Sequence, residues 1–209
     1  MPQDVSYWIN RKREDKKLDW RIGEKDWLEG YWQSVNHPHR KLILKALESF
    51  YPFKSLLEVG CNVGPNLKLI QDKFPKVELA GSDVNIEALK IAKQRLPKVD
   101  IYIDNIENSL IKRQFDIVLV DAVLMYIPPE RILKAMENIS YLAKKGVILV
   151  EWKSESFLGK VMYHHWARNY RKILKKMGWR NIKEIKIPKE IWSTENWARL
   201  GYIFVARPQ

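Results

Sequence analysis

The sequence contains a single cysteine, Cys61, among its 209 residues. A lone cysteine cannot form an internal disulfide, which excludes the disulfide-rich secreted scaffolds. The chain also lacks any run of about 18 apolar residues, so no membrane-spanning helix is predicted. Its first ten residues show no basic segment followed by an apolar one, the pattern of a secretory leader. We therefore expect a cytoplasmic protein that does not span a membrane.

Glycine is scarce, with nine residues, and two of these lie close together after an apolar run. Residues 55–66 read SLLEVGCNVGPN, a short β-type segment that ends in an acid and then passes Gly60 and Gly64 before a helical pattern. Glycine at such a turn permits positive φ and a close approach of the backbone to a ligand. The first turn of the following helix offers unpaired N–H groups. This segment predicts a nucleotide-type cofactor site.

The same segment lacks what a pyrophosphate cofactor needs. A dinucleotide fingerprint reads G-x-G-x-x-G, whereas Asn62 and Pro65 stand where further glycines are expected, and no Gly-Lys-Ser/Thr of a P-loop follows. Glu58, at the end of the strand, would repel a pyrophosphate but attract a sulfonium or ammonium group. The residues therefore favour S-adenosylmethionine over NAD or ATP.

Acidic residues close four consecutive predicted strands. Residues 76–82 lead to Asp83, about 20 residues past the glycine turn, where an acid binds ribose hydroxyls in doubly wound folds. Residues 99–103 lead to Asp104 and Asn105, a pair suited to adenine. Residues 115–120 lead to Asp121. Because open α/β sheets bind ligands at this edge, the acids predict one site.

The stretches LLEVGCNVGPNL, GSDVN, IYIDNIE and FDIVLVDAVLMYIPPE resemble the successive motifs of the class I S-adenosylmethionine-dependent methyltransferases, over residues 53–208. The family usually has glycine at the position of Asn62, and asparagine tolerates the left-handed region. The resemblance implies that the first acid and the glycine loop hold the methionine part of the cofactor. The cofactor-binding set predicted from the residues and the resemblance is Trp32, Arg40, Glu58, Gly60, Cys61, Asn62, Gly64, Asn66, Asp83, Val84, Asp104, Asn105 and Asp121.

Within this set, Arg40 and Trp32 lie before the first strand. A basic residue at the start of the helix predicted over residues 39–50 is placed to bind the cofactor's carboxylate, and an aromatic residue of the N-terminal segment is placed to pack beside it. A solvated helix face is the alternative for Arg40.

The predicted fold is α/β: a doubly wound, mostly parallel, seven-stranded Rossmann-like sheet with helices on both faces and an antiparallel C-terminal edge strand. Residues 53–209 form this domain, and residues 1–52 form a helical lid on it, with one or two helices over 1–32. Further helices are predicted over residues 85–95, 128–144 and 157–177, and a loop over 191–200. The last strands are predicted over 182–187 and 202–206.

Methyl transfer needs alignment of acceptor, methyl and sulfur, so no obligatory catalytic triad and no metal site are expected. A general base is needed only for an acceptor that holds its proton tightly. Candidates for that base are Asp121, Glu151 and His165, and candidate acceptor-binding residues are Tyr126, Glu151, His165 and Trp192. Each also has a structural interpretation, as a core, loop-orienting or ion-paired residue. Aromatic residues of the C-terminal part suggest an aromatic-lined acceptor site.

The acceptor is less closely defined. Residues 151–209 hold thirteen basic and five acidic side chains. This excess of positive charge can attract nucleic acid, or it can be the solvent-facing side of an ordinary amphipathic helix. We favour an O- or N-methyltransferase acting on a small molecule or a glycan- or lipid-linked acceptor. An RNA methyltransferase is the runner-up, and an inactive cofactor-binding partner subunit is a further alternative. The residues leave the acceptor and the oligomeric state open.

Overall fold

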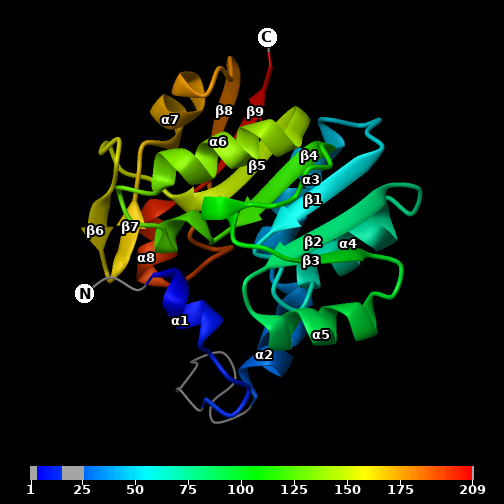
Figure 1. Cartoon of the computed structure of the whole chain (residues 1–209). Helices are drawn as coiled ribbons and strands as arrows, with labels where there is room; N and C mark the ends of the chain where they lie inside the picture. The colour runs from blue at the N-terminus through cyan, green and yellow to red at the C-terminus, as the bar shows by residue number, and fades with distance from the viewer. Residues whose placement is uncertain (1–3, 16–25, 209) are drawn as a thin grey trace.

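A seven-stranded sheet forms the centre of the protein, seen in a computed structural model that describes residues 4–15 and 26–208 (Figure 1). The strand order across the sheet is β3-β2-β1-β4-β5-β9-β8. The strands are β1 (Ser55–Val59), β2 (Glu78–Asp83), β3 (Asp100–Ile103), β4 (Phe115–Asp121), β5 (Ala143–Trp152), β8 (Asn181–Lys186) and β9 (Gly201–Arg207).

Pairing is parallel from β3 through to β5, whereas β9 runs antiparallel to both β5 and β8. The chain reverses direction at β9, which lies between β5 and the edge strand β8. The central strand β4 is buried at every position except Asp121. Burial on both faces explains its continuous apolar run and is typical of parallel sheets. The predicted Rossmann-like fold with its antiparallel C-terminal strand is confirmed.

Helices cover both faces of the sheet. The helices α6 (Ile132–Leu142) and α7 (Tyr170–Lys176) pack on one face, and α3 (His39–Glu48), α4 (Pro65–Lys73) and α5 (Ile86–Arg95) pack on the other. The helix α6 begins after the two prolines at 128 and 129. Among the described residues, no helix is long and apolar enough to cross a membrane.

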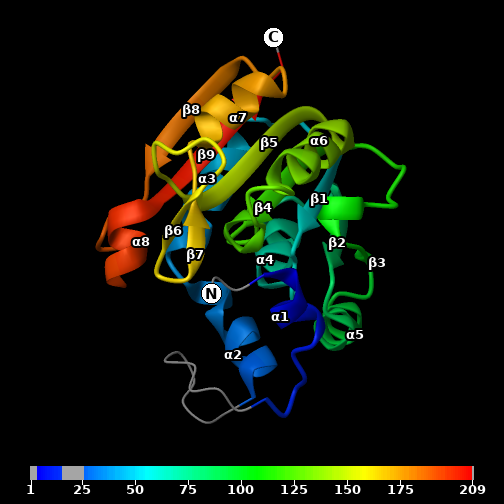
Figure 2. The ribbon, with the colours of Figure 1, turned by 60° about the vertical axis from the view of Figure 1, so that its left-hand side comes forward.

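The N-terminal segment packs at the carboxyl edge of the sheet. It contains α1 (Val5–Ile9), α2 (Trp27–Gln33) and the 3-10 turn η1 (Ser34–Asn36), and residues 16–25 of the predicted helical stretch lie outside the described residues. The Asn85 amide, at the start of α5, donates to the carbonyls of Trp8 and Arg11, at 2.8 Å each. Figure 2 shows α1 and α2 below the sheet. The division of the chain into a lid of residues 1–52 and a Rossmann-like domain of residues 53–209 stays a prediction.

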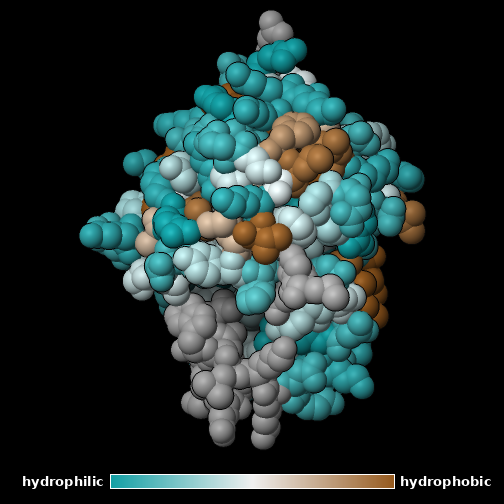
Figure 3. Space-filling view, turned by 90° about the vertical axis from the view of Figure 1, so that its left-hand side faces the viewer, coloured by the Kyte–Doolittle hydropathy of each residue, from teal (hydrophilic) through white to brown (hydrophobic). Residues whose placement is uncertain are grey.

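The helix predicted over residues 157–177 is wrong for most of its length. The chain instead forms a small hairpin, β6 (Lys160–Met162) and β7 (His165–Ala167), and only α7 is helical. Tyr163 and His164 adopt positive φ in the hairpin turn, which a helix cannot contain. The hairpin lies on a face of the molecule that is largely hydrophilic and carries a few scattered hydrophobic side chains (Figure 3). Leu158 and Val161 are exposed apolar residues of this segment.

The loop predicted over residues 191–200 is also partly wrong, because α8 (Glu195–Leu200) is helical. Glu195 lies in its first turn and Arg199 in its last, which suits the helix dipole. This short helix places Trp197 against Trp152 of β5, with ring centroids 5.9 Å apart.

Candidate functional site

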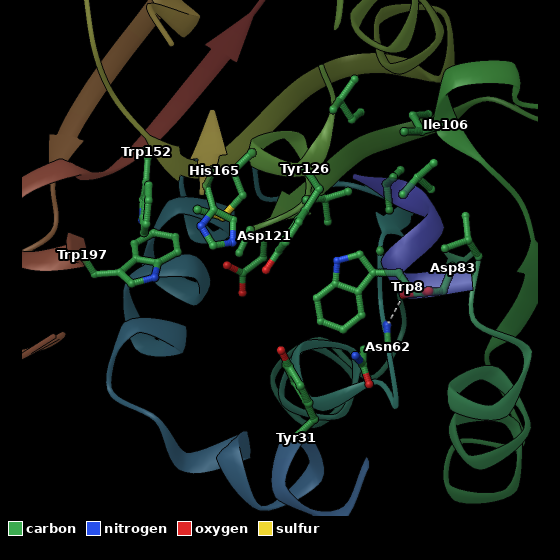
Figure 4. A pocket seen from close by; sticks show the side chains of 18 of the residues that line it. Trp8, Tyr31, Asn62, Asp83, Ile106, Asp121, Tyr126, Trp152, His165 and Trp197 are labelled. Atoms are coloured by element: carbon green, nitrogen blue, oxygen red, sulfur yellow. Dashed lines mark hydrogen bonds between the residues drawn. The ribbon is translucent and has the colours of Figure 1, made fainter. Parts of the chain in front are cut away.

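A cavity of about 410 Å³ lies at the carboxyl ends of the parallel strands, bounded also by the N-terminal segment, β7 and the residues before α8 (Figure 4). It contains most of the residues predicted from the sequence. Those that line it are Arg40, Gly60, Asn62, Asp83, Val84, Asp104, Asn105, Asp121, Tyr126, His165 and Trp192. The predicted residues that do not line it are Trp32, Glu58, Cys61, Gly64, Asn66 and Glu151.

The glycine loop has the backbone conformation that its sequence requires. Gly60 has φ of 73°, and a Cβ there would lie 2.2 Å from Val123 Cγ2. Asn62 has φ of 51°, so this asparagine adopts the left-handed conformation, which asparagine tolerates better than most residues. The loop is joined to β2, because the Asn62 N–H donates to Asp83 Oδ2 at 2.8 Å. Gly64 has φ of 84° and forms the N-cap of α4.

Asp83 lies at the end of β2 and faces the cavity. Its Oδ1 accepts the Asn85 N–H at 2.9 Å, and its Oδ2 accepts the Asn62 N–H. Burial raises the pKa of Asp83, and these N–H donors oppose that rise. Both oxygens are thereby held in place where ribose hydroxyls can bind.

Beneath the loop, buried polar groups form a network. The Asn66 amide donates to Glu58 Oε1 at 2.7 Å and to Asp121 Oδ2 at 3.0 Å, and Arg40 Nη1 donates to Asn66 Oδ1 at 2.5 Å. Burial raises the pKa of Glu58 to about 8. These residues support the floor of the cavity rather than line it, apart from Arg40 and Asp121.

Four carboxylate oxygens of this region are buried without a hydrogen-bond partner among the described residues, and all but the first belong to residues that line the cavity: Glu58 Oε2, Asp104 Oδ2, Glu107 Oε1 and Asp121 Oδ1. Unsatisfied buried acceptors are costly, and they suit a ligand that brings donors or positive charge. A sulfonium, an ammonium group and two ribose hydroxyls meet that description. The residues present therefore fit S-adenosylmethionine.

Asp121 has a partner that the sequence did not reveal. His39 Nε2 lies 3.1 Å from Asp121 Oδ2, and His39 Nδ1 lies 2.5 Å from His37 Nδ1. Both histidines line the cavity. Burial opposes the ionised form of Asp121, but the charge and hydrogen bond of His39, with help from Arg40, lower its pKa to about 2. Asp121 is thus an ionised orienting group and a poor proton acceptor.

Glu151, predicted as a base or acceptor ligand, is fully buried in β5. Its carboxylate accepts the backbone N–H groups of Val123, Leu124 and Met125, at 2.8, 2.7 and 3.2 Å. Burial raises its pKa to about 8. Glu151 therefore holds the loop and the 3-10 turn η3 (Leu124–Tyr126) that follow β4, on which Tyr126 is carried.

Aromatic side chains surround the remainder of the cavity. The Trp192 and Trp197 rings stack with centroids 3.8 Å apart, and Trp192 also lies 4.3 Å from the His39 ring. Figure 4 places Asp121 between Trp152 and Trp197 on one side and Trp8, Asn62 and Asp83 on the other. The aromatic residues that line the cavity are Trp8, Tyr31, Tyr126, Trp152, Trp192 and Trp197.

The structure places Trp32 and His165 differently from the sequence-based predictions. Trp32 lies outside the cavity with the Arg95 guanidinium 4.6 Å above its ring, and Trp8 and Tyr31 of the same N-terminal segment face the cavity instead. His165 does face it, although from a strand. Its Nδ1 lies 2.9 Å from the Tyr163 carbonyl, so Nδ1 carries the proton, and burial lowers its pKa.

Comparison with known proteins agrees with this geometry. The family described as a methyltransferase domain matches residues 57–149. Malonyl-(acyl-carrier protein) O-methyltransferase of Anoxybacillus flavithermus is 26% identical over 143 residues, which are 68% of this chain and 51% of that protein. Trans-aconitate 2-methyltransferase of Rhodopseudomonas palustris is 26% identical over 99 residues, 47% of this chain and 38% of that protein. The chain thus spans about half the length of the first relative and a smaller share of the second.

The magnesium protoporphyrin IX methyltransferase of Synechocystis PCC 6803, crystallised with bound S-adenosylmethionine, has the same fold. The TM-score is 0.67 at 16% sequence identity, over 98% of this chain and 95% of that chain. The chain is thus similar to methyltransferases over residues 57–149, and its fold is that of a Rossmann-like methyltransferase structure. The S-adenosylmethionine bound in that solved structure is the cofactor that the residues of this cavity fit.

Proposed function

We propose that this protein transfers the methyl group of S-adenosylmethionine to an oxygen or nitrogen atom of a small acceptor. The observation that carries the proposal is the composition of the cavity. Asp83 lies at one end together with Asn62 of the glycine loop and Trp8, whereas Trp152 and Trp197 lie at the other end, and Asp121 lies between them (Figure 4). A cofactor and a compact acceptor can therefore meet in one cavity, which aligned methyl transfer requires.

The chain's own residues have separate roles in this proposal. Asp83 binds the ribose hydroxyls, and Asp104 and Asn105 face the adenine. The glycine loop approaches the methionine part, and Arg40 lies close enough to bind its carboxylate. The bound cofactor supplies an electrophilic methyl group and its own leaving group, so the protein's task is to orient the acceptor and exclude water. The aromatic walls serve both purposes.

Two features argue against RNA as the acceptor. The helix α7, with its lysines, packs against α6, β8 and β9, and it runs away from the cavity end of the sheet. Arg168 is not part of a basic surface, because it is fully buried and donates to the carbonyls of Leu124, Ile127 and Leu158. Arg171 is paired with Glu184 at 2.8 Å. An acceptor linked to a glycan or lipid stays an alternative.

The proposal is tested first by calorimetric titration with S-adenosylmethionine, S-adenosylhomocysteine and NAD. We expect binding of the first two and none of NAD. Methyl transfer is then followed with methyl-labelled S-adenosylmethionine and a panel of small phenols, amines and carboxylic acids. Tight NAD binding without a response to S-adenosylhomocysteine would overturn the proposal. Cofactor binding with no transfer to any acceptor class would instead favour the inactive partner subunit.

A further inference from the structure

The turn η3 forms the part of the cavity wall that lies between the glycine loop and the hairpin of β6 and β7. We propose that Glu151 and Arg168 are positioning residues for methyl transfer. One holds η3 by its N–H groups and the other by its carbonyls, and together they fix the wall along which methyl donor and acceptor meet. The proposal rests on the proposed function, since it assigns two further residues to the same site.

Side chains of η3 and of the residue before it face both the glycine loop and the hairpin. Val123 lies against the glycine loop, since a Cβ added at Gly60 would overlap its Cγ2. Tyr126, the last residue of η3, lies between His165 and Trp8, with ring centroids 4.8 and 5.3 Å from theirs (Figure 4). Both Val123 and Tyr126 line the cavity. The backbone of η3 therefore determines where these side chains stand beside a bound cofactor and acceptor.

The backbone that leads into η3 is strained. Ala122, between β4 and η3, has φ of 57°, a left-handed conformation that is unfavourable for a residue with a Cβ. Two hydrogen bonds close the turn itself, from the Tyr126 N–H to the Val123 carbonyl and from the Ile127 N–H to the Leu124 carbonyl, at 3.0 and 3.1 Å. A strained backbone of this kind persists where the surrounding structure holds it in place.

Glu151 holds the N–H groups of the turn. The first N–H groups of a helical turn have no partner inside it, and the apolar N-cap residue, Val123, cannot supply one from its side chain. The carboxylate of Glu151 supplies it from β5. Its Oε1 accepts the N–H groups of Val123 and Leu124 at 2.8 and 2.7 Å, and its Oε2 accepts that of Met125 at 3.2 Å. The cap of η3 thus comes from a different strand of the sheet.

Arg168 holds the carbonyls. Its Nη1 donates to the Leu124 carbonyl at 2.7 Å, and its Nη2 donates to the Ile127 carbonyl. Its Nε donates to the Leu158 carbonyl, just before β6, at 2.8 Å. Arg168 is itself fixed beside β5, because its backbone N–H donates to the Trp152 carbonyl at 3.0 Å. One planar guanidinium therefore ties both η3 and the hairpin to β5.

The burial of the two side chains argues for a role in position. Glu151 and Arg168 are both fully buried. Burying such groups is costly, and apolar residues of similar volume often stabilise a core equally well or better. What apolar residues cannot supply is direction, because hydrogen bonds to N–H groups and carbonyls fix the orientation of each peptide unit that they reach.

Tyr170 provides a comparison within the same part of the core. Its side chain is fully buried, and burial, together with the charge of Glu151, raises the pKa of its hydroxyl. That hydroxyl makes no hydrogen bond to η3 among the described residues. Tyr170→Phe therefore removes a buried polar group beside Glu151 without releasing η3, and it is the matched control.

Two conservative variants loosen the hold on η3. Glu151→Gln keeps one acceptor oxygen and replaces the other with a donor, so the three N–H groups can no longer all be satisfied. Arg168→Lys keeps the positive charge but loses the planar fork that reaches separate carbonyls. Both variants retain most of the buried volume.

The first measurement is backbone amide hydrogen exchange by NMR, on the full-length protein saturated with S-adenosylhomocysteine. We expect the amides of Leu124 and Met125 to exchange about tenfold faster or more in Glu151→Gln and Arg168→Lys, the scale of losing a hydrogen bond to a charged group. Amides of β1 and β4 should keep their rates, and Tyr170→Phe should match the wild type throughout. Affinity for S-adenosylhomocysteine should stay within about threefold of the wild type.

The second measurement is turnover with the phenol, amine or carboxylic acid that the wild type methylates best. Arg168→Lys and Glu151→Gln should lower kcat about 10- to 100-fold, because a displaced wall misaligns the acceptor. The KM for S-adenosylmethionine should change much less than kcat. Tyr170→Phe should retain the kcat of the wild type.

Three results would overturn the inference without touching the proposed function. They are unchanged exchange at η3 in both variants, a normal kcat in a variant whose η3 amides exchange faster, and faster exchange throughout the sheet or loss of folding in both variants, which would assign the pair to stability alone. A wild type that binds no S-adenosylhomocysteine would overturn the proposed function instead, and the assignment to methyl transfer with it.

Discussion

His39 at the start of α3 and Asp121 at the end of β4 lie 82 positions apart in the sequence, yet their side chains are joined at 3.1 Å. This contact ties the N-terminal part of the chain to the carboxyl edge of the sheet at the centre of the cavity. Asp121 accepts from Asn66 through the same oxygen, so the glycine-loop helix α4 is held in the same network. The cofactor end and the acceptor end of the cavity therefore share one carboxylate.

The first prediction concerns Asp83→Ala. The change removes the carboxylate that we assign to the ribose, and it also frees the Asn62 N–H, so affinity for S-adenosylhomocysteine should fall by about 1 to 3 kcal/mol. Calorimetric titration measures this loss. Asp72→Ala is a matched control, since Asp72 is an exposed acid on α4 paired only with Lys68 in the described structure. Equal affinity of the Asp83 variant and the wild type would remove Asp83 from the site.

The second prediction compares two glycines of positive φ. In Gly60→Ala the new Cβ would overlap Val123 Cγ2, which lines the cavity, so both thermal stability and S-adenosylhomocysteine binding should be lost. Gly178 has φ of 92°, and a Cβ at this position would have no neighbouring atom of the described chain within 4 Å, so Gly178→Ala should cost only about 1 kcal/mol of backbone strain. Thermal melts with and without ligand separate the two. Normal ligand binding by Gly60→Ala would show that the close approach at the loop is not needed.

The third prediction follows from Glu151, whose pKa burial raises to about 8 from an ordinary value of 4.5. Between these pH values the folded protein keeps a proton that the unfolded chain has released. The free energy of unfolding should therefore fall as pH rises from about 5 to 8, with a slope of up to about 1.4 kcal/mol per pH unit for this group. Burial also raises the pKa of Glu58 to about 8, so Glu58 lowers the free energy of unfolding over the same pH range as pH rises.

Glu151→Gln resembles the protonated carboxyl and should remove the contribution of Glu151, which is about half of the combined slope from Glu58 and Glu151. Denaturant titrations at several pH values provide the measurement, and Glu137→Gln on the exposed side of α6 is the control. A pH dependence unchanged by Glu151→Gln would mean that Glu151 is ionised throughout, held by its three backbone N–H donors.

The strand ends were predictable because each buried strand is an apolar run followed by an acid. Asp83, Asp104 and Asp121 reach one cavity for that reason alone. The hairpin of residues 160–167 was not predictable in the same way. Its apolar residues Met162, Trp166 and Tyr170 have helical spacing, but the turn at positive φ and the pairing of Val161 with Trp166 determine a different structure.

The acceptor end was harder to predict than the cofactor end. His39 acquires its role through a contact with a strand far along the chain, and no local pattern marks it. Trp8 is similar, because its place in the cavity depends on the Asn85 amide that binds the backbone of residues 8 and 11. Glu151, a candidate base and acceptor ligand in the sequence, lies near the end of an apolar strand. It differs from the cofactor acids because the loop after β4 folds over it and uses its oxygens.

The last prediction tests the basic helix α7. Lys172, Lys175 and Lys176 lie on the side of the sheet that α6 also covers, and Lys175 and Lys176 end the helix far from the cavity end of β5. If they track RNA, binding should weaken steeply with salt, because each neutralised phosphate releases counterions, and the triple change to glutamine should flatten that dependence. We expect instead negligible RNA binding near physiological ionic strength and unchanged methyl transfer in the triple variant, because these lysines face solvent. Fluorescence anisotropy with a generic RNA over a salt series decides the matter. Micromolar or tighter binding that disappears in the triple variant would make RNA the acceptor class to pursue.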